Sequence, residues 1–270
     1  MNILTFILFA ALLVPLGRTV ETAIKDADGL TSWVYTPTSR PDPTKTYWLV
    51  VGVHGATGNG KGACGVAGWA TTMDDVVVLG PSFLTPNRAE IEKQGSPAAE
   101  AAFLRDTFLM CGSIHEAKLK AQIAELRRSW RLQPKIMLHG FSGGAQFSHR
   151  FAFKNPDLVV AVSAHSAGSW AQIEGDDRIN PEARSIRFAT SCGEADTAKR
   201  YITSLPRIEG FRTFSAQLLM LGFNVQVSSW PGVGHTQTDE VKAMALALLE
   251  RVRKTSLPKE PQKSSERIVK

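Results

Sequence analysis

Residues 135–146 read KIMLHGFSGGAQ, a short apolar strand followed by a turn with one serine and by the start of a helix. Gly140, Ser142 and Gly144 match the pattern G-x-S-x-G. A serine at the tip of such a turn has a strained backbone, and the residues two before and two after it must be small so that strand and helix can pass closely. The helix directs its first N–H groups toward the serine, which favours an anion there. The segment therefore predicts a nucleophilic serine.

Apolar runs alternate with helical segments along the rest of the chain. Strands are expected at residues 32–36, 47–53, 76–81, 158–163, 186–191 and 225–230. Helices are expected at 97–110 and 114–131, after the serine, over 211–221, and from 238 or 239 onward. Such alternation predicts an α/β fold with right-handed βαβ units and a mostly parallel sheet that helices cover on both faces. In these sheets the functional residues gather at the carboxyl ends of the strands.

A serine needs a base, and His235 is the candidate. It stands in a glycine-rich segment, residues 232–236, after the last expected strand and before the last expected helix. Histidine suits the role because it can take the serine proton and return it to the leaving group near neutral pH. A loop histidine without a function is the alternative. The chain order Ser, Asp, His favours the catalytic interpretation.

The base needs a carboxylate that holds its tautomer and stabilises the imidazolium. Asp196 is the candidate, in the segment Gly193-Glu194-Ala195-Asp196 after the preceding expected strand. Glu194 is the alternative. Asp196 is preferred because the turn after Gly193 gives the shorter side chain a defined approach.

The oxyanion formed during acyl transfer needs two backbone N–H groups. Gly143, the residue after the serine, supplies one. The loop that follows the strand at 47–53 supplies the other, with Ala56 as the candidate and Gly55 as the alternative. His54 is expected to support this loop rather than to transfer protons. The remaining histidines beside strands and helices are expected to pack or to form hydrogen bonds, and these are His139, His149 and His165.

The loop at residues 55–62 also matches G-x-x-x-x-G-K, the spacing of a phosphate-binding loop. Gly62 occupies the position where a hydroxyl would hold Mg²⁺, and no later apolar strand ends in a suitable aspartate. Nucleotide binding is therefore the less favoured alternative, and no cofactor is expected. The cysteines, Cys64, Cys111 and Cys192, have no metal-type spacing, so no metal is expected. One disulfide and one free thiol would fit an exported protein, with the pairing open.

Length and composition indicate one globular catalytic domain, expected at residues 21–253. The chain has 270 residues, of which 43% are hydrophobic and 21% charged. Its net charge is +6, but residues 254–270 alone hold five Lys/Arg against two Glu, and this basic tail is expected to be disordered. A nucleic-acid surface is therefore not required, and no arginine-rich helix occurs.

The first 15 residues form an apolar run that ends at Pro15. The run is too short to cross a bilayer, which takes about 20 residues. It is typical of a secretory signal peptide, expected over residues 1–20, with cleavage near 17–19 or 22–23. The protein is therefore expected to be secreted or periplasmic, without stable membrane insertion once the leader is removed. A membrane-anchored or uncleaved leader is the alternative.

Taken in chain order, the loop at 54–56, the serine turn, Asp196 and His235 resemble an α/β-hydrolase over residues 30–253. Within that superfamily, residues 140–145, followed by 155–157 and 164–168, resemble secreted esterases of the polyhydroxybutyrate depolymerase and feruloyl esterase type.

The resemblance implies Ser142 as nucleophile, Asp196 as acid and His235 as base in the cleavage of a small or polymeric carboxylic ester through an acyl-enzyme. A peptidase or an acyltransferase shares this triad and is the alternative. Residues 82–96 are the longest candidate for a substrate-facing loop.

Overall fold

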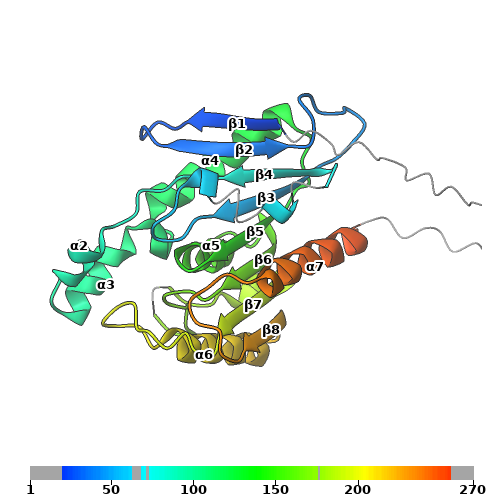
Figure 1. Cartoon of the computed structure of the whole chain (residues 1–270). Coiled ribbons are helices and arrows are strands. Elements are labelled where there is room, and N and C mark those ends of the chain that lie inside the picture. The colour runs from blue at the N-terminus through cyan, green and yellow to red at the C-terminus, as the bar shows by residue number, and fades with distance from the viewer. Residues whose placement is uncertain (1–19, 63–67, 71–72, 176, 257–270) are drawn as a thin grey trace, which may run out of the picture.

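The computed structural model describes residues 20–62, 68–70, 73–175 and 177–256. Within them, one sheet has the strand order β1-β2-β4-β3-β5-β6-β7-β8 (Figure 1). The strands are β1 (Val20–Lys25), β2 (Thr31–Thr36), β3 (Trp48–Val53), β4 (Val76–Gly80), β5 (Ile136–Phe141), β6 (Val159–His165), β7 (Arg187–Gly193) and β8 (Asn224–Trp230). Strands β3 to β8 pair with their neighbours in parallel, whereas β2 pairs antiparallel with both β1 and β4.

Helices connect the parallel strands and cover both faces of the sheet. The α-helices are α2 (Arg88–Glu92), α3 (Pro97–Arg105), α4 (Ser113–Ser129), α5 (Gly143–Lys154), α6 (Arg207–Met220) and α7 (Asp239–Ser256). Short 3₁₀ helices are η1 (Gly68–Ala70), η2 (Phe108–Met110) and η3 (Pro181–Ser185). All residues of β3 and β4 are buried, because these strands are covered on both sides.

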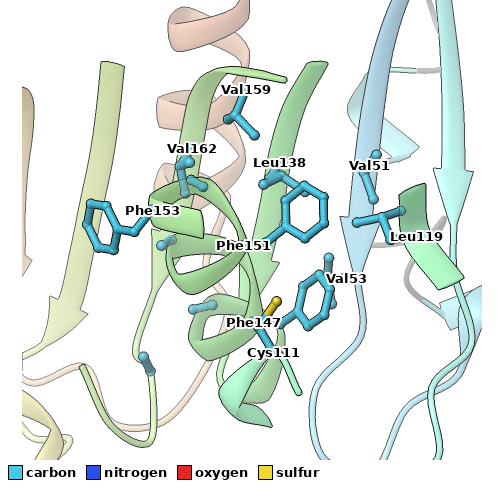
Figure 2. Close-up of a cluster of buried hydrophobic side chains, with 14 of the residues drawn as sticks. Val51, Val53, Cys111, Leu119, Leu138, Phe147, Phe151, Phe153, Val159 and Val162 are labelled. Carbon is cyan, nitrogen blue, oxygen red and sulfur yellow. The ribbon is translucent and has the colours of Figure 1, made fainter. Parts of the chain in front are cut away.

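The larger part of the core lies between the sheet and the helices α4, α5 and α6. Figure 2 shows Phe147 and Phe151 of α5 pointing toward Leu138 of β5 and Val53 of β3. Both phenylalanines are fully buried, and each such side chain contributes about 1.5–3 kcal/mol through burial. The helix that follows Ser142 is thus anchored on the strands that carry the neighbouring loops. On the opposite face, α7 packs against β6 and β7.

The structure corrects several expectations about the elements. The helix expected at 97–110 is two elements, because Thr107 has an extended backbone, with φ of −79° and ψ of 161°, between α3 and η2. The loop expected at 82–96 contains α2, which a capping box of Asn87 and Glu90 begins. The final helix continues through Ser256, past residue 253, at which the catalytic domain is expected to end.

The first strand was not expected. Since β1 is paired along its whole length with β2, cleavage of a leader at 22–23 would cut the strand in two. The apolar run at residues 1–15 lies outside the described residues. None of the helices in the described part of the chain is both long enough and apolar enough to span a membrane.

Candidate active site

Ser142 occupies a sharp turn between β5 and α5. Its φ of 57° and ψ of −118° are unfavourable for a residue with a side chain, and its N–H donates to the His165 carbonyl at 2.9 Å. A Cβ atom on Gly140 would collide with the backbone of Gly144, and one on Gly144 would collide with the Val53 carbonyl. The two glycines are therefore required by close approach, as the G-x-S-x-G pattern predicts.

His235 joins Ser142 to Asp196. The imidazole Nε2 lies 2.9 Å from Ser142 Oγ, and Nδ1 lies 2.7 Å from Asp196 Oδ2. A carboxylate only accepts hydrogen bonds, so Nδ1–H donates to Asp196 and Nε2 is left to accept the serine proton. The alternative carboxylate, Glu194, accepts instead from Ser229 Oγ at 2.8 Å. The structure thus brings three of the expected residues together and places Glu194 outside the group.

An arginine also contacts the buried carboxylate of Asp196. Arg207 Nη1 lies 3.3 Å from Oδ1, the oxygen that His235 does not use. The N–H of Ile208, in the first turn of α6, donates to the Asp196 carbonyl at 3.1 Å. Both oxygens of a side chain that is 2% exposed are therefore occupied. No local sequence pattern pointed to Arg207, because the contact depends on how α6 docks.

The backbone nitrogen of Ala56 lies close to Gly143, the residue after the serine. A Cβ atom on Gly143 would lie 2.9 Å from the Ala56 nitrogen, and one on Gly55 would lie 3.8 Å from Ser142 Cβ. Neither N–H group makes a hydrogen bond within the described residues. The pair is thus available for an oxyanion, and Ala56 rather than Gly55 is the residue whose nitrogen adjoins Gly143.

His54 fixes the loop that carries Ala56. Its Nδ1–H donates to the Gly55 carbonyl at 2.7 Å, and its Nε2 accepts from the Phe83 N–H at 2.9 Å. The carbonyl of Gly55 and the N–H of Ala56 belong to one planar trans peptide and point in opposite directions. Holding the carbonyl therefore aims the N–H away from His54. Burial lowers the pKa of His54, which keeps the ring neutral in this role.

The comparisons with known proteins concern the fold. No family model matches the chain, and no curated protein matches it. A thermostable esterase superposes with a TM-score of 0.59 at 18% identity, over 88% of this chain and 63% of its own. Poly(aspartic acid) hydrolase-1 from Sphingomonas sp. KT-1 superposes with a TM-score of 0.58 at 16% identity, over 86% of this chain and 98% of its own. A ferulic acid esterase from Anaeromyces mucronatus superposes with a TM-score of 0.57 at 14% identity, over 85% of this chain and 89% of its own.

The chain has the α/β-hydrolase fold. The mostly parallel sheet and its covering helices agree with the expected fold class, and the solved structures above share the arrangement. In this α/β-hydrolase fold, the loops that follow β3, β5, β7 and β8 meet at one edge of the sheet and carry Ala56, Ser142, Asp196 and His235 respectively.

The remaining histidines of the α/β-hydrolase fold lie in its interior. His165 bonds to the hydroxyls of Ser163 and Ser191, each at 2.6 Å, and His149 Nδ1–H donates to the Ala145 carbonyl at 2.6 Å. Burial lowers the pKa of His139 to about 4 and lowers the pKa of the other two well below the ordinary value. They are buried structural groups, as expected.

The glycine-rich loop after β3 makes contacts that fix it to the sheet edge. Lys61 forms an ion pair with Glu21 of β1 at 3.0 Å and lies 4.5 Å above the ring of Trp33. Gly60 donates its N–H to Ser82 Oγ at 2.7 Å. Lys61, the residue that would hold a nucleotide phosphate, is thus paired with a carboxylate.

The thiols of the fold are buried and uncharged. Cys111 and Cys192 are free, and burial raises the pKa of each to about 12. Cys64 lies outside the described residues. In the described ranges, no cluster of three His, Cys, Asp or Glu side chains is arranged to hold a metal ion.

Proposed function

We propose that this chain is a serine hydrolase that cleaves carboxylic esters through an acyl-enzyme. The observation that carries the proposal is the continuous hydrogen-bond path from Ser142 Oγ through His235 to Asp196, beside two N–H groups that have no partner among the described residues. The esterases among the solved structures of similar fold support ester substrates.

The first half of the reaction forms the acyl-enzyme. Ser142 Oγ attacks the ester carbonyl carbon while its proton passes to His235 Nε2, and the carbonyl oxygen becomes an oxyanion bound by the N–H groups of Ala56 and Gly143. Asp196 stabilises the imidazolium that results. When the tetrahedral intermediate collapses, the bond to the alcohol oxygen breaks, and His235 gives that oxygen its proton.

The second half repeats these steps with water. His235 takes a proton from a water molecule whose oxygen adds to the acyl carbon, and the same N–H pair binds the new oxyanion. The bond to Ser142 Oγ then breaks, the serine regains its proton from His235, and the carboxylic acid leaves. All groups return to their starting state, so the cycle needs no cofactor.

The replacement Ser142→Ala tests the assignment. The rate of p-nitrophenyl acetate hydrolysis should fall on the order of 10⁴- to 10⁶-fold, because the nucleophile is lost. Ser129→Ala, at an exposed serine at the end of α4, is the matched control and should keep full activity. A fluorophosphonate probe should label the parent at Ser142 alone. Labelling of another residue, or activity in Ser142→Ala protein, would show that the assignment is wrong.

Hydrolysis of amides is the second candidate, because one of the similar solved structures is named a poly(aspartic acid) hydrolase, whose substrate has amide bonds. Peptidase and acyltransferase activities use the same residues. Rates for matched p-nitrophenyl ester and p-nitroanilide substrates, with and without added alcohol as acyl acceptor, separate the three activities.

For localisation, we propose export with removal of a leader before Val20. The support is that β1 begins at Val20, so cleavage at or before residue 19 leaves the sheet intact. N-terminal sequencing of protein recovered outside the cytoplasm should read Val20 or an earlier residue. A mature N-terminus inside β1, or retention of Met1, would contradict this.

A further inference from the structure

A cavity of about 1040 Å³ lies at the same edge of the sheet as Ser142 but outside the serine site. The segment after β4, the helices α3 and α4, and the turn between β1 and β2 line it. Figure 1 shows α2 and α3 projecting from this end of the sheet. Ser142 and His235 do not line it. Since β4 and β3 lie between β2 and β5, and neighbouring strands are about 4.8 Å apart, roughly 10–15 Å of sheet separates the cavity from the serine.

The walls of the cavity are apolar and open to solvent. Leu84 is 71% exposed and Ile114 is 70% exposed, and among the described residues only Met220 is a comparably exposed large hydrophobic side chain. Both line the cavity, together with the half-buried ring of Phe103. Apolar side chains gathered at a concave surface mark a binding site rather than ordinary surface variation.

The lining of the cavity includes one imidazole. His115 is 8% exposed and lines the cavity; its backbone N–H donates to the Gly112 carbonyl, whereas its ring nitrogens make no hydrogen bond to any described residue. Its contacts are with aromatic rings, including that of Phe83 at 5.6 Å. Burial, and then the charge of Lys118, lowers the pKa of His115, so the ring is neutral at pH 7. A neutral imidazole offers one donor and one acceptor, which a hydroxyl group satisfies.

The charges around the cavity disfavour an anion. Its lining has one ammonium group, Lys118, and four carboxylates, Asp26, Asp28, Glu90 and Asp106. Lys118 lies 2.9 Å from Asp26 and 2.8 Å from Asp28, so its charge is already paired. A ligand that carries a carboxylate would therefore face uncompensated negative charge.

We propose that this cavity binds an uncharged ligand with an aromatic or aliphatic body and a hydroxyl group, the hydroxyl bonding to His115. The site is separate from Ser142 and stands whether or not the chain hydrolyses esters. It gives a role to the segment after β4, which the sequence had indicated as a substrate-facing loop.

The test uses 2-naphthol as the uncharged probe and 2-naphthoate as its anionic counterpart, with binding measured by calorimetry at pH 7. The parent should bind 2-naphthol saturably, and at least 10-fold more tightly than 2-naphthoate. Treatment with a fluorophosphonate should leave this binding unchanged, because Ser142 is not part of the site.

Two tryptophan variants of α4 provide the matched comparison. Ala121 is exposed and lines the cavity, whereas Ala124 is also exposed on the same helix but does not line it. Ala121→Trp should weaken 2-naphthol binding at least 10-fold, and Ala124→Trp should not change it. His115→Phe, which keeps the aromatic volume, should weaken binding about 5-fold through loss of the hydrogen bond.

Several results would overturn the proposal. These are a lack of saturable binding in the parent, equal binding in the two tryptophan variants, equal or tighter binding of the anion, or loss of binding after fluorophosphonate treatment. Light scattering provides the last check. If Ala121→Trp alone changes the molar mass, the cavity is a contact between copies of the chain and not a small-ligand site.

Discussion

Replacement of Gly143 by alanine directly tests the pairing of the two oxyanion donors. The backbone of Gly143 is not in the left-handed region, so alanine is compatible with its conformation. The new methyl carbon, however, would lie 2.9 Å from the Ala56 nitrogen and 2.9 Å from Leu109 Cδ2. Contacts of 3.4 Å or more are ordinary, so the Ala56 nitrogen must move by about half an ångström.

The size of the effect follows from this displacement. A misplacement of 1 Å at a reacting centre costs about 100-fold in rate, and loss of a whole oxyanion donor costs about 100- to 1000-fold. For half an ångström we expect kcat/KM to fall about 10- to 100-fold, equivalent to about 1.4–2.7 kcal/mol of transition-state stabilisation. Alanine favours helix by up to about 1 kcal/mol over glycine, which offsets part of the strain, so the fold should be retained.

The assay is the steady-state hydrolysis of p-nitrophenyl acetate, with thermal unfolding as the check on folding. Gly62→Ala is the control, since among the described residues a Cβ atom there would meet only Asn59 Oδ1, at 3.8 Å, and activity should be unchanged. If folded Gly143→Ala protein retains kcat/KM within about 3-fold of the parent, Ala56 is not an oxyanion donor and the reasoning fails.

Three further outcomes follow from the buried polar groups. His54→Phe releases the peptide that carries the second oxyanion donor, so kcat should fall about 10-fold with KM nearly constant; a rise in KM alone would contradict the assigned role. Arg207→Met removes the partner of Asp196 Oδ1 and should lower kcat about 10-fold, far less than the roughly 10⁴-fold expected for Asp196→Asn; equal losses would contradict this ranking. The pKa of His139 is about 4 in the folded chain and near 6.5 in the unfolded chain. The contribution of this neutral, buried ring to the free energy of unfolding is therefore fully present above pH 6.5 and is lost as the pH falls toward 4. Between pH 7 and pH 4, urea titrations should show that the parent loses about 3 kcal/mol more unfolding free energy than His139→Gln does. Equal losses in the two proteins would contradict the prediction.

The sequence identified those parts of the fold that depend on local patterns. Continuous apolar runs placed the buried strands, and the small residues around Ser142 placed the turn. Two elements were missed for opposite reasons. In β1 the residues are mostly exposed, so no apolar run exists to be detected. For α2 the signal was present, since Asn87 and Glu90 form a capping box, but the helix has only five residues.

The contacts that refine the site are not local. His54 meets the N–H of Phe83 because β3 and β4 bring their loops to one edge, and Arg207 meets Asp196 because the connection after β7 folds back on itself before α6. No spacing in the sequence encodes these pairs. The same holds for the cavity beside His115, whose walls come from four different segments. Sequence patterns could therefore propose the nucleophile, base and acid, and a supporting role for His54, but not the partners Phe83 and Arg207 through which the site is held.

The distance along the chain between Ser142 and His235 has a consequence for folding. Their hydrogen bond joins residues 93 positions apart, and β6 and β7 must be in register before β8 can bring His235 to the serine. Contacts between such distant residues form late, since the entropy of closing the loop is paid first. In a refolding experiment, the return of activity should therefore lag behind helix formation seen by circular dichroism and mark the completion of the sheet at β8.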